Sequence, residues 1–312
     1  MNPPACLALK IDVDTDRGTA IGVPNLVADL AAAGAPATFF FSLGPDNTGR
    51  AITRVFRPGF LRKVGRTSVL RNYGLRTLLN GTLLPAPDIG RRHAATLRNV
   101  AAAGFETGIH CHDHYRWQDH LHRMPRPRIA AEFQSARTAY TAIFGAAAIG
   151  AAAPGWQCNA DSRAVYDEAA LLYGSDTRGS TPFFPWLGTR AGSALEIPTT
   201  LPTLDELLGR PEFPEHRLAE HLLAQIAPGQ THVFTLHAEL EGMRYRGFFR
   251  ELLAAVRARG IHWTTLERIA RAALTAPAQI PICPLEQREI DGRSGLVATQ
   301  GLPLEIIAGR RA

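Results

Sequence analysis

The 312-residue sequence predicts an α/β fold: a distorted (β/α) barrel of about seven parallel strands with a basic amphipathic insertion. Short apolar runs alternate with longer helix-like stretches about seven times, as in parallel sheets that are covered by helices. The length suits one large domain, and the 46% hydrophobic content excludes a disordered, collagenous or coiled-coil protein. A doubly wound open sheet is the alternative arrangement of the same units.

The expected strands are apolar runs, and the expected helices have apolar residues at helical spacing and mostly end at a glycine. Strands are expected at residues 7–13, 38–43, 105–109, 231–236 and 261–265, with shorter candidates before 153, near 173 and at 195–198. Helices are expected at residues 23–33, 93–103, 128–144, 162–172, 216–226, 248–259 and 266–274. Residues 1–275 therefore form the predicted catalytic barrel. Residues 276–312 are expected to be a C-terminal tail that wraps the surface or is partly disordered.

The insertion at residues 46–88 carries the basic character of the chain. No acidic residue lies between Asp46 and Asp88, and apolar residues interleave with eight basic ones. This composition is typical of a surface that lies on an anionic membrane, and a solvated helical insertion is the alternative. Nucleic-acid binding is not expected, because the interleaved residues are mostly aliphatic and no known module is visible. The expected membrane or lipid-phosphate contacts are Arg54, Arg57, Arg62, Lys63, Arg66 and Arg71.

The compartment is predicted from three absences in the sequence. No run of 18 apolar residues is present, so no membrane-spanning segment is expected. The first residues lack the basic region of a secretory signal. Four widely spaced cysteines do not suggest a disulfide framework or a cysteine metal site. We therefore expect a protein of the reducing cytoplasm.

Ionisable residues and one rigid loop follow the predicted strands, at the ends that form the active site in barrel enzymes. They are Asp12 and Asp14; His110 and His114; Pro154, Gly155 and Trp156; Asp176 and Arg178; and His237 and Glu239.

The first two groups predict a metal site. Asp12 and Asp14 share one face of a strand, where two carboxylates repel each other unless a cation or a proton lies between them. On a helical turn, the H-x-x-x-H spacing of His110 and His114 puts two imidazoles on one side. With Asp14, they complete a two-histidine, one-carboxylate set that accepts Zn²⁺, Mn²⁺, Co²⁺ or Fe²⁺, and the sequence does not choose among these. His237 is either a structural histidine or a general acid on the same rim.

In this order, the residues resemble the five motifs of the polysaccharide deacetylase family. The resemblance implies an amide hydrolase on a distorted barrel, with one divalent metal (Zn, Mn or Co) held by Asp14, His110 and His114. It also implies that Asp12 is the base and His237 the acid. A closer similarity is to deformylases of this family that act on a formamido-arabinose linked to undecaprenyl phosphate. The strings that carry it are DRGT (16–19), FSLGPDN (41–47), SDTRG (175–179), LPTLDE (201–206) and TLHAE (235–239).

That similarity implies a polyprenyl-phosphate-linked sugar as substrate, a role in lipid A modification and polymyxin resistance, and a peripheral position on the inner face of the bacterial inner membrane. A deacetylase of an N-acetylated glycan is the alternative, and the oligomeric state is left open. The implied substrate-binding residues are Arg17, Pro154, Gly155, Trp156, Asp176, Arg178 and Glu239.

One departure from the family pattern concerns the base. The third family motif has an arginine two residues before its proline, and this arginine orients the base. Here Pro154 follows three alanines, at residues 151–153. We expect that Arg178 or Arg17 takes over this work, or that the base is oriented differently; the departure favours the lipid-linked sugar as substrate.

Overall fold

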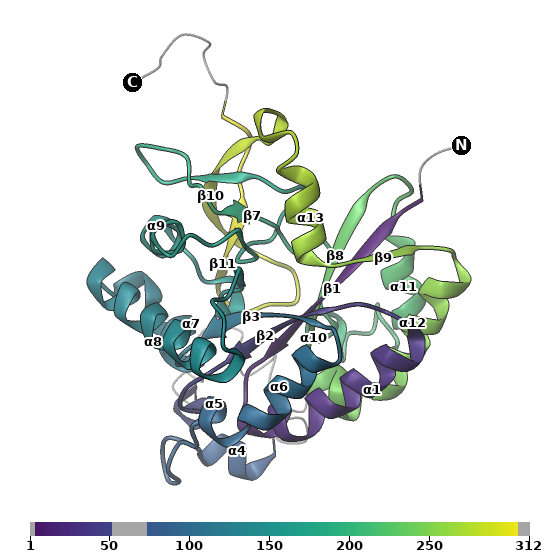
Figure 1. The fold of residues 1–312 in the computed structure, drawn as a ribbon. Coiled ribbons are helices and arrows are strands. Elements are labelled where there is room, and N and C mark those ends of the chain that lie inside the picture. Colours follow the sequence, from purple (N-terminus) through teal and green to yellow (C-terminus); the bar gives the residue numbers. More distant parts are fainter. Residues whose placement is uncertain (1–3, 52–73, 305–312) are drawn as a thin grey trace.

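The computed structural model describes residues 4–51 and 74–304, and its centre is a curled sheet of parallel strands (Figure 1). Seven strands follow one another in the order β7-β5-β4-β3-β2-β1-β8, and β9 pairs with β1. Their bounds are β1 (Cys6–Val13), β2 (Thr38–Ser42), β3 (Glu106–Cys111), β4 (Gly150–Ala151), β5 (Tyr173–Gly174), β7 (Leu195–Glu196), β8 (Thr231–His237) and β9 (His262–Thr264). The predicted strands are therefore confirmed.

The sheet curls far enough to approach a closed barrel. Beyond β7, the backbone N–H groups of Thr200 and Leu201 both donate to the carbonyl of Val233 in β8, at distances of 3.1 and 3.2 Å. These bonds link the segment after β7 to β8, so the prediction of a distorted (β/α) barrel is confirmed, in the form of a curled half-barrel, and the doubly wound open sheet is not found.

Strand β1 pairs with three other strands, and its two faces differ. It pairs with β8 along almost its whole length, and with β9 and β2 along its first and second halves. Because side chains alternate along a strand, Leu7, Leu9 and Ile11 belong to the large core that includes the helices, whereas Ala8 belongs to the smaller core inside the barrel. Lys10 and Asp12 share the face of Ala8, so two charged residues project into the interior.

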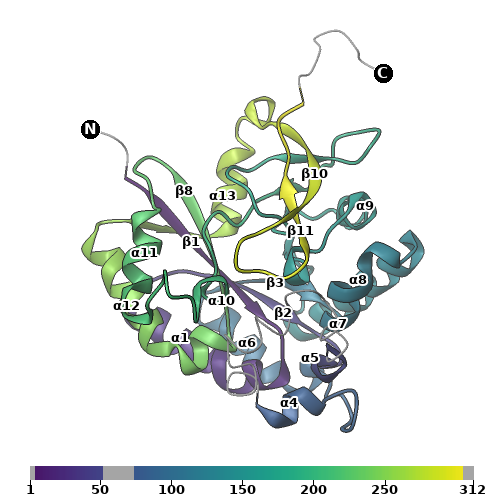
Figure 2. The same ribbon diagram turned by 180° about the vertical axis from the view of Figure 1, so that it is seen from behind.

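Helices cover the outer face of the sheet (Figures 1 and 2). The longer ones are α1 (Val23–Ala33), α6 (Ala94–Ala102), α8 (Arg126–Phe144), α9 (Ala160–Glu168), α11 (Leu218–Ala224) and α12 (Arg246–Ala258). Helix α13 (Leu266–Ala273) packs instead against the smaller interior core, through Leu266 and Ala270. Helix α1 illustrates why they form where predicted. Pro24 lies in its first turn, its apolar stripe includes the buried Leu26 and Leu30, and Gly34 ends it in the left-handed conformation at φ 63°.

The C-terminal segment contains a β-hairpin that the sequence pattern did not predict. Strands β10 (Ile282–Glu289) and β11 (Leu296–Gln300) are antiparallel, and β10 also pairs with β6 (Phe184–Trp186). The hairpin buries few apolar side chains, chiefly Cys283 and Val297, so its alternation of apolar and polar residues is weak.

Most of the basic insertion lies outside the described residues, including all six of its predicted lipid contacts. The part that is described includes the short helix α4 (Leu75–Leu79), and the short helix α5 (Ile89–Arg92) begins directly after the insertion. In the described ranges, no helix is both long and apolar enough to cross a membrane.

Candidate active site

Asp14, His110 and His114 converge at the carboxyl ends of β1 and β3, which flank β2 in the sheet. One ligand atom from each of the three residues lies within 4.8 Å of the others. His110 Nε2 is 3.2 Å from Asp14 Oδ1, and His114 Nε2 is 3.5 Å from Asp14 Oδ2. The expectation that both histidines share a helical turn is wrong: His110 belongs to β3, and His114 opens α7 (His114–His120), which Asp113 caps through the N–H of Arg116.

The residues present fit a divalent metal. Asp14 Oδ1 and His110 Nε2 are buried, and within residues 4–51 and 74–304 neither has a hydrogen-bond partner. Desolvation would raise the pKa of Asp14, but the neighbouring His114 and His110 lower it well below its usual range. An ionised carboxylate with two imidazoles is a donor set that suits Zn²⁺, Mn²⁺ or Co²⁺.

Asp12 lies beside this set, inside the barrel and almost fully buried. Its Oδ1 is 3.9 Å from His110 Nδ1, and its Oδ2 is 3.7 Å from the ammonium of Lys10. Asp12 Oδ1 also has no hydrogen-bond partner in the described part of the chain. One carboxylate oxygen of Asp12 is therefore held near a cation and the other is free to accept a proton.

His237 ends β8, and the register of the sheet puts it next to Asp12. Desolvation lowers the pKa of His237, but the charges of Asp14, Asp205 and Asp12 raise it by more, so the net pKa is above its ordinary value. Its backbone N–H donates to Glu241 Oε2 at 2.9 Å. A histidine that favours its protonated form can act as a proton donor at neutral pH.

Glu239 holds the backbone of the turn that follows β1. It is almost fully buried, and its Oε1 accepts hydrogen bonds from the N–H of Asp14 at 3.1 Å and from the N–H and hydroxyl of Thr15 at 2.9 and 2.7 Å. Burial and the charge of Asp14 raise the pKa of Glu239 to about 8. In this arrangement, Glu239 fixes the turn that carries Asp14.

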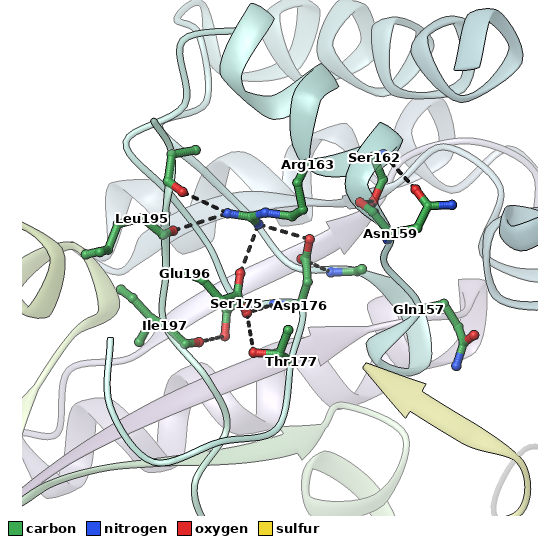
Figure 3. Close-up of polar contacts among 12 residues, drawn as sticks. Gln157, Asn159, Ser162, Arg163, Ser175, Asp176, Thr177, Leu195, Glu196 and Ile197 are labelled. Atoms are coloured by element: carbon green, nitrogen blue, oxygen red, sulfur yellow. Dashed lines mark hydrogen bonds and ion pairs between the residues drawn. The ribbon is translucent and has the colours of Figure 1, made fainter. Parts of the chain in front are cut away.

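Asp176 is fully buried in a network of charges (Figure 3). Its Oδ1 accepts from the N–H of Ala153 at 2.7 Å, and its Oδ2 is 3.1 Å from Arg163 Nη1. The same guanidinium lies 2.9 Å from Glu196 Oε2. The network anchors the backbone just before Pro154, so the structure places Asp176 behind the loop that faces the site.

That loop is the short 3₁₀ turn Pro154–Trp156, in which Gly155 has a φ of 58°. The indole of Trp156 lies under three cations: Arg293 Cζ is 4.4 Å, Arg178 Cζ is 5.2 Å and Lys10 Nζ is 5.4 Å from the ring centroid. Arg178 also pairs with Glu206 at 2.6 Å. Arg17, the remaining predicted contact, is half-buried after β1. Its guanidinium lies beside Gly74, where a Cβ would approach Nη1 to 3.1 Å.

Sequence reasoning missed Lys10, Arg163, Glu196, Arg293 and Glu241. Each is a charged side chain that the fold buries, and single charged residues in apolar stretches leave no periodic signal. The lysine at position 10 offered the one available cue, because a charge inside the apolar strand 7–13 needs a partner.

Comparisons with known proteins agree with this geometry. A family model described as polysaccharide deacetylase matches residues 6–174. The chain belongs to the polysaccharide deacetylase family. This membership supports a hydrolase of the deacetylase or deformylase kind, which acts on an amide.

Two relatives of this family member carry the name probable 4-deoxy-4-formamido-L-arabinose-phosphoundecaprenol deformylase ArnD. The one from Shewanella sediminis is 33% identical over 94% of each chain. The one from Wigglesworthia glossinidia brevipalpis is 33% identical over 91% of this chain and 98% of its own. The close resemblance expected from the strings is thus confirmed.

Solved structures confirm the fold. A crystal structure assigned to the polysaccharide deacetylases, from Mycobacterium smegmatis, superposes with a TM-score of 0.63 at 20% identity and covers 93% of this chain and 96% of that chain. The allantoinase Puue superposes with a TM-score of 0.59 at 16% identity, covering 88% and 94%.

Proposed function

We propose that this polysaccharide deacetylase family member is a metal-dependent deformylase of 4-deoxy-4-formamido-L-arabinose-phosphoundecaprenol. It would release formate and leave the 4-amino sugar lipid, a step in lipid A modification that confers resistance to cationic peptides such as polymyxin. The observation that carries the proposal is the set of Asp14, His110 and His114, flanked by Asp12 and His237, in a chain 33% identical to deformylases so named over 94% of its length.

Asp14, His110 and His114 would hold the metal, which when bound supplies a Lewis acid for the formamide carbonyl and lowers the pKa of a bound water. Asp12 takes one proton from the water that attacks the carbonyl carbon, using its free oxygen Oδ1. His237 donates a proton to the sugar nitrogen as the C–N bond breaks, and formate leaves. Loss of either proton-transfer residue is expected to lower the rate by about 10²- to 10⁴-fold.

The test is formate release from the lipid-linked formamido sugar by metal-stripped protein, with and without added Mn²⁺, Co²⁺ or Zn²⁺. We expect release only with metal, and none from Asp14→Ala. Asp161→Ala, which removes an exposed carboxylate from the first turn of α9, is the matched control and should behave as wild type. Acetate release from an N-acetylated glycan, with no formate release from the lipid substrate, would replace this proposal with the glycan deacetylase alternative.

We also propose that residues 46–88 dock the protein on the anionic inner face of the bacterial inner membrane, which would bring the site to a polyprenyl-linked substrate. Eight basic residues without an acidic one support this, as do the exposed Leu75 and Leu83 at the described end of the segment.

Membrane docking predicts binding to vesicles that contain anionic lipid, and weaker binding at high salt because the attraction is electrostatic. Neutralising four of the six predicted contacts (Arg54, Arg57, Arg62 and Arg66, each to Gln) should abolish sedimentation with these vesicles. The same number of changes at exposed arginines in and next to α12 and α13 (Arg257, Arg259, Arg268 and Arg271, each to Gln) should not. Equal binding to neutral vesicles would contradict the electrostatic part of the proposal.

A further inference from the structure

We infer that Lys10 is the positioning residue of the base Asp12, in place of the arginine that the third family motif lacks here. The inference rests on the proposed function only in that Asp12 is taken as the base of the amide hydrolysis. Its own observation is the juxtaposition of Lys10, Asp12, Ser175 and Trp156 inside the barrel.

Lys10 lies on the interior face of β1, where its ammonium has three neighbours. The residue is fully buried, and its Nζ donates a hydrogen bond to the carbonyl of Ser175 at 2.7 Å. The same Nζ lies 3.7 Å from Asp12 Oδ2 and 5.4 Å from the centroid of the Trp156 ring. Because residues two apart on a strand share a face, the strand itself fixes Lys10 beside Asp12.

A buried ammonium is costly unless opposite charge and hydrogen bonds compensate for lost water. Lys10 has both: a carbonyl acceptor and the carboxylate of Asp12. The attraction acts on Oδ2 and leaves Oδ1 without a hydrogen-bond partner among the described residues. Lys10 therefore orients the carboxylate so that the free oxygen faces the site.

Two other cations of this region, Arg163 and Arg178, are engaged elsewhere. Arg163 is bound to Asp176 and Glu196, and Arg178 is bound to Glu206 and to the carbonyl of Leu201. The expectation that Arg178 replaces the missing arginine is therefore not met, whereas Lys10 stands at ion-pair distance from the base.

The experiment compares three variants at position 10 in the holoenzyme. Lys10→Gln removes the charge but keeps a donor for Ser175, Lys10→Met removes both, and Lys10→Arg keeps the charge. We expect kcat to fall about 10²-fold in the first two with KM changed less than about threefold, and Lys10→Arg to stay within about tenfold of wild type. On an Asp12→Asn background, Lys10→Gln should cost nothing further, because residues that act as a unit are not additive.

Metal content by mass spectrometry and the thermal midpoint are measured for every variant, to separate lost positioning from lost folding. A folded Lys10→Gln with wild-type kcat overturns the inference, as does a loss that multiplies with that of Asp12→Asn. If the neutral variants do not fold, Lys10→Arg tests the inference. Its effect on kcat should then disappear when Asp12 is also changed to Asn.

Failure of the proposed function is distinguishable from failure of this inference. If wild type releases acetate from a glycan and no formate, the proposed substrate falls and the same variants are assayed on the glycan. Crystal structures give a readout independent of turnover. We expect the Asp12 carboxylate to rotate away from the site in Lys10→Gln, and an unmoved carboxylate would overturn the inference.

Discussion

Burial of the single carboxyl group of Glu241 makes the free energy of unfolding depend on pH. Burial raises its pKa to about 7, although His237 acts in the opposite direction, whereas an unfolded chain gives a glutamate a pKa of about 4.3. The folded state therefore holds the proton more tightly between these two values. Glu241 should therefore lower the free energy of unfolding as pH rises from about 4.3 to about 7, by up to roughly 4 kcal/mol. Glu241→Gln should remove this contribution and leave the one that Glu239 makes through its own raised pKa. Urea unfolding at pH 5 and pH 8 measures it, with the exposed Glu251→Gln as the control that keeps the wild-type slope.

Individual site residues were predictable where a motif placed them at a strand end. Asp12, Asp14, His110, His114 and His237 come together as their positions after the strands indicated. The supporting charges were not predictable, because their partners are far away in sequence: Lys10 meets the carbonyl of Ser175, and Arg293 meets Trp156. Only the three-dimensional fold creates these pairs.

At the scale of elements, the β10–β11 hairpin contributes to the site that it covers. Arg293, in the turn of the hairpin, lies 4.4 Å from the Trp156 centroid and 3.6 Å from Glu206, with a side chain only 10% exposed. Arg293→Ala should lower the free energy of unfolding by about 1–3 kcal/mol, because it leaves Glu206 less compensated and removes a cation–π contact. Chemical denaturation checks this value. Arg288→Ala, on β10 with a 62% exposed side chain, should change stability by less than about 0.5 kcal/mol. If the two changes lowered the free energy of unfolding equally, the contacts of Arg293 with Trp156 and Glu206 would contribute no more to stability than an exposed arginine does.

The long strands were predicted from clear apolar runs, and the short strands only as candidates of uncertain extent. Strands β1, β2 and β8 are buried over most of their lengths, so their sequences carry unbroken apolar runs. Strands β4, β5 and β7 have two residues each, too few for periodicity to fix their bounds, so they could be predicted only by approximate position.

For the whole molecule, a metal bound by Asp14, His110 and His114 would join the end of β1 to β3 and to the start of α7. A metal that binds only the folded chain should raise the free energy of unfolding by about 2.7 kcal/mol when its concentration is 100 times its Kd. Thermal unfolding of metal-stripped protein, titrated with Mn²⁺, Co²⁺ or Zn²⁺, measures this increase. Asp14→Ala should lose it and Asp161→Ala should keep it. A wild-type midpoint that no metal shifts would refute a metal site at these residues.

The pairing of β1 with the late strand β8 has a consequence for synthesis on the ribosome. Ala8 leaves the ribosome early, but its partner Val233 is made about 225 residues later, roughly 10–45 s at typical rates of ~5–20 residues per second. Until then, one edge of an apolar strand has no neighbour, and Lys10 and Asp12 have no barrel around them. The nascent chain is thus exposed to aggregation for most of its translation, and a chaperone that shields its first strands should matter more for this protein than for one of equal size with local pairing.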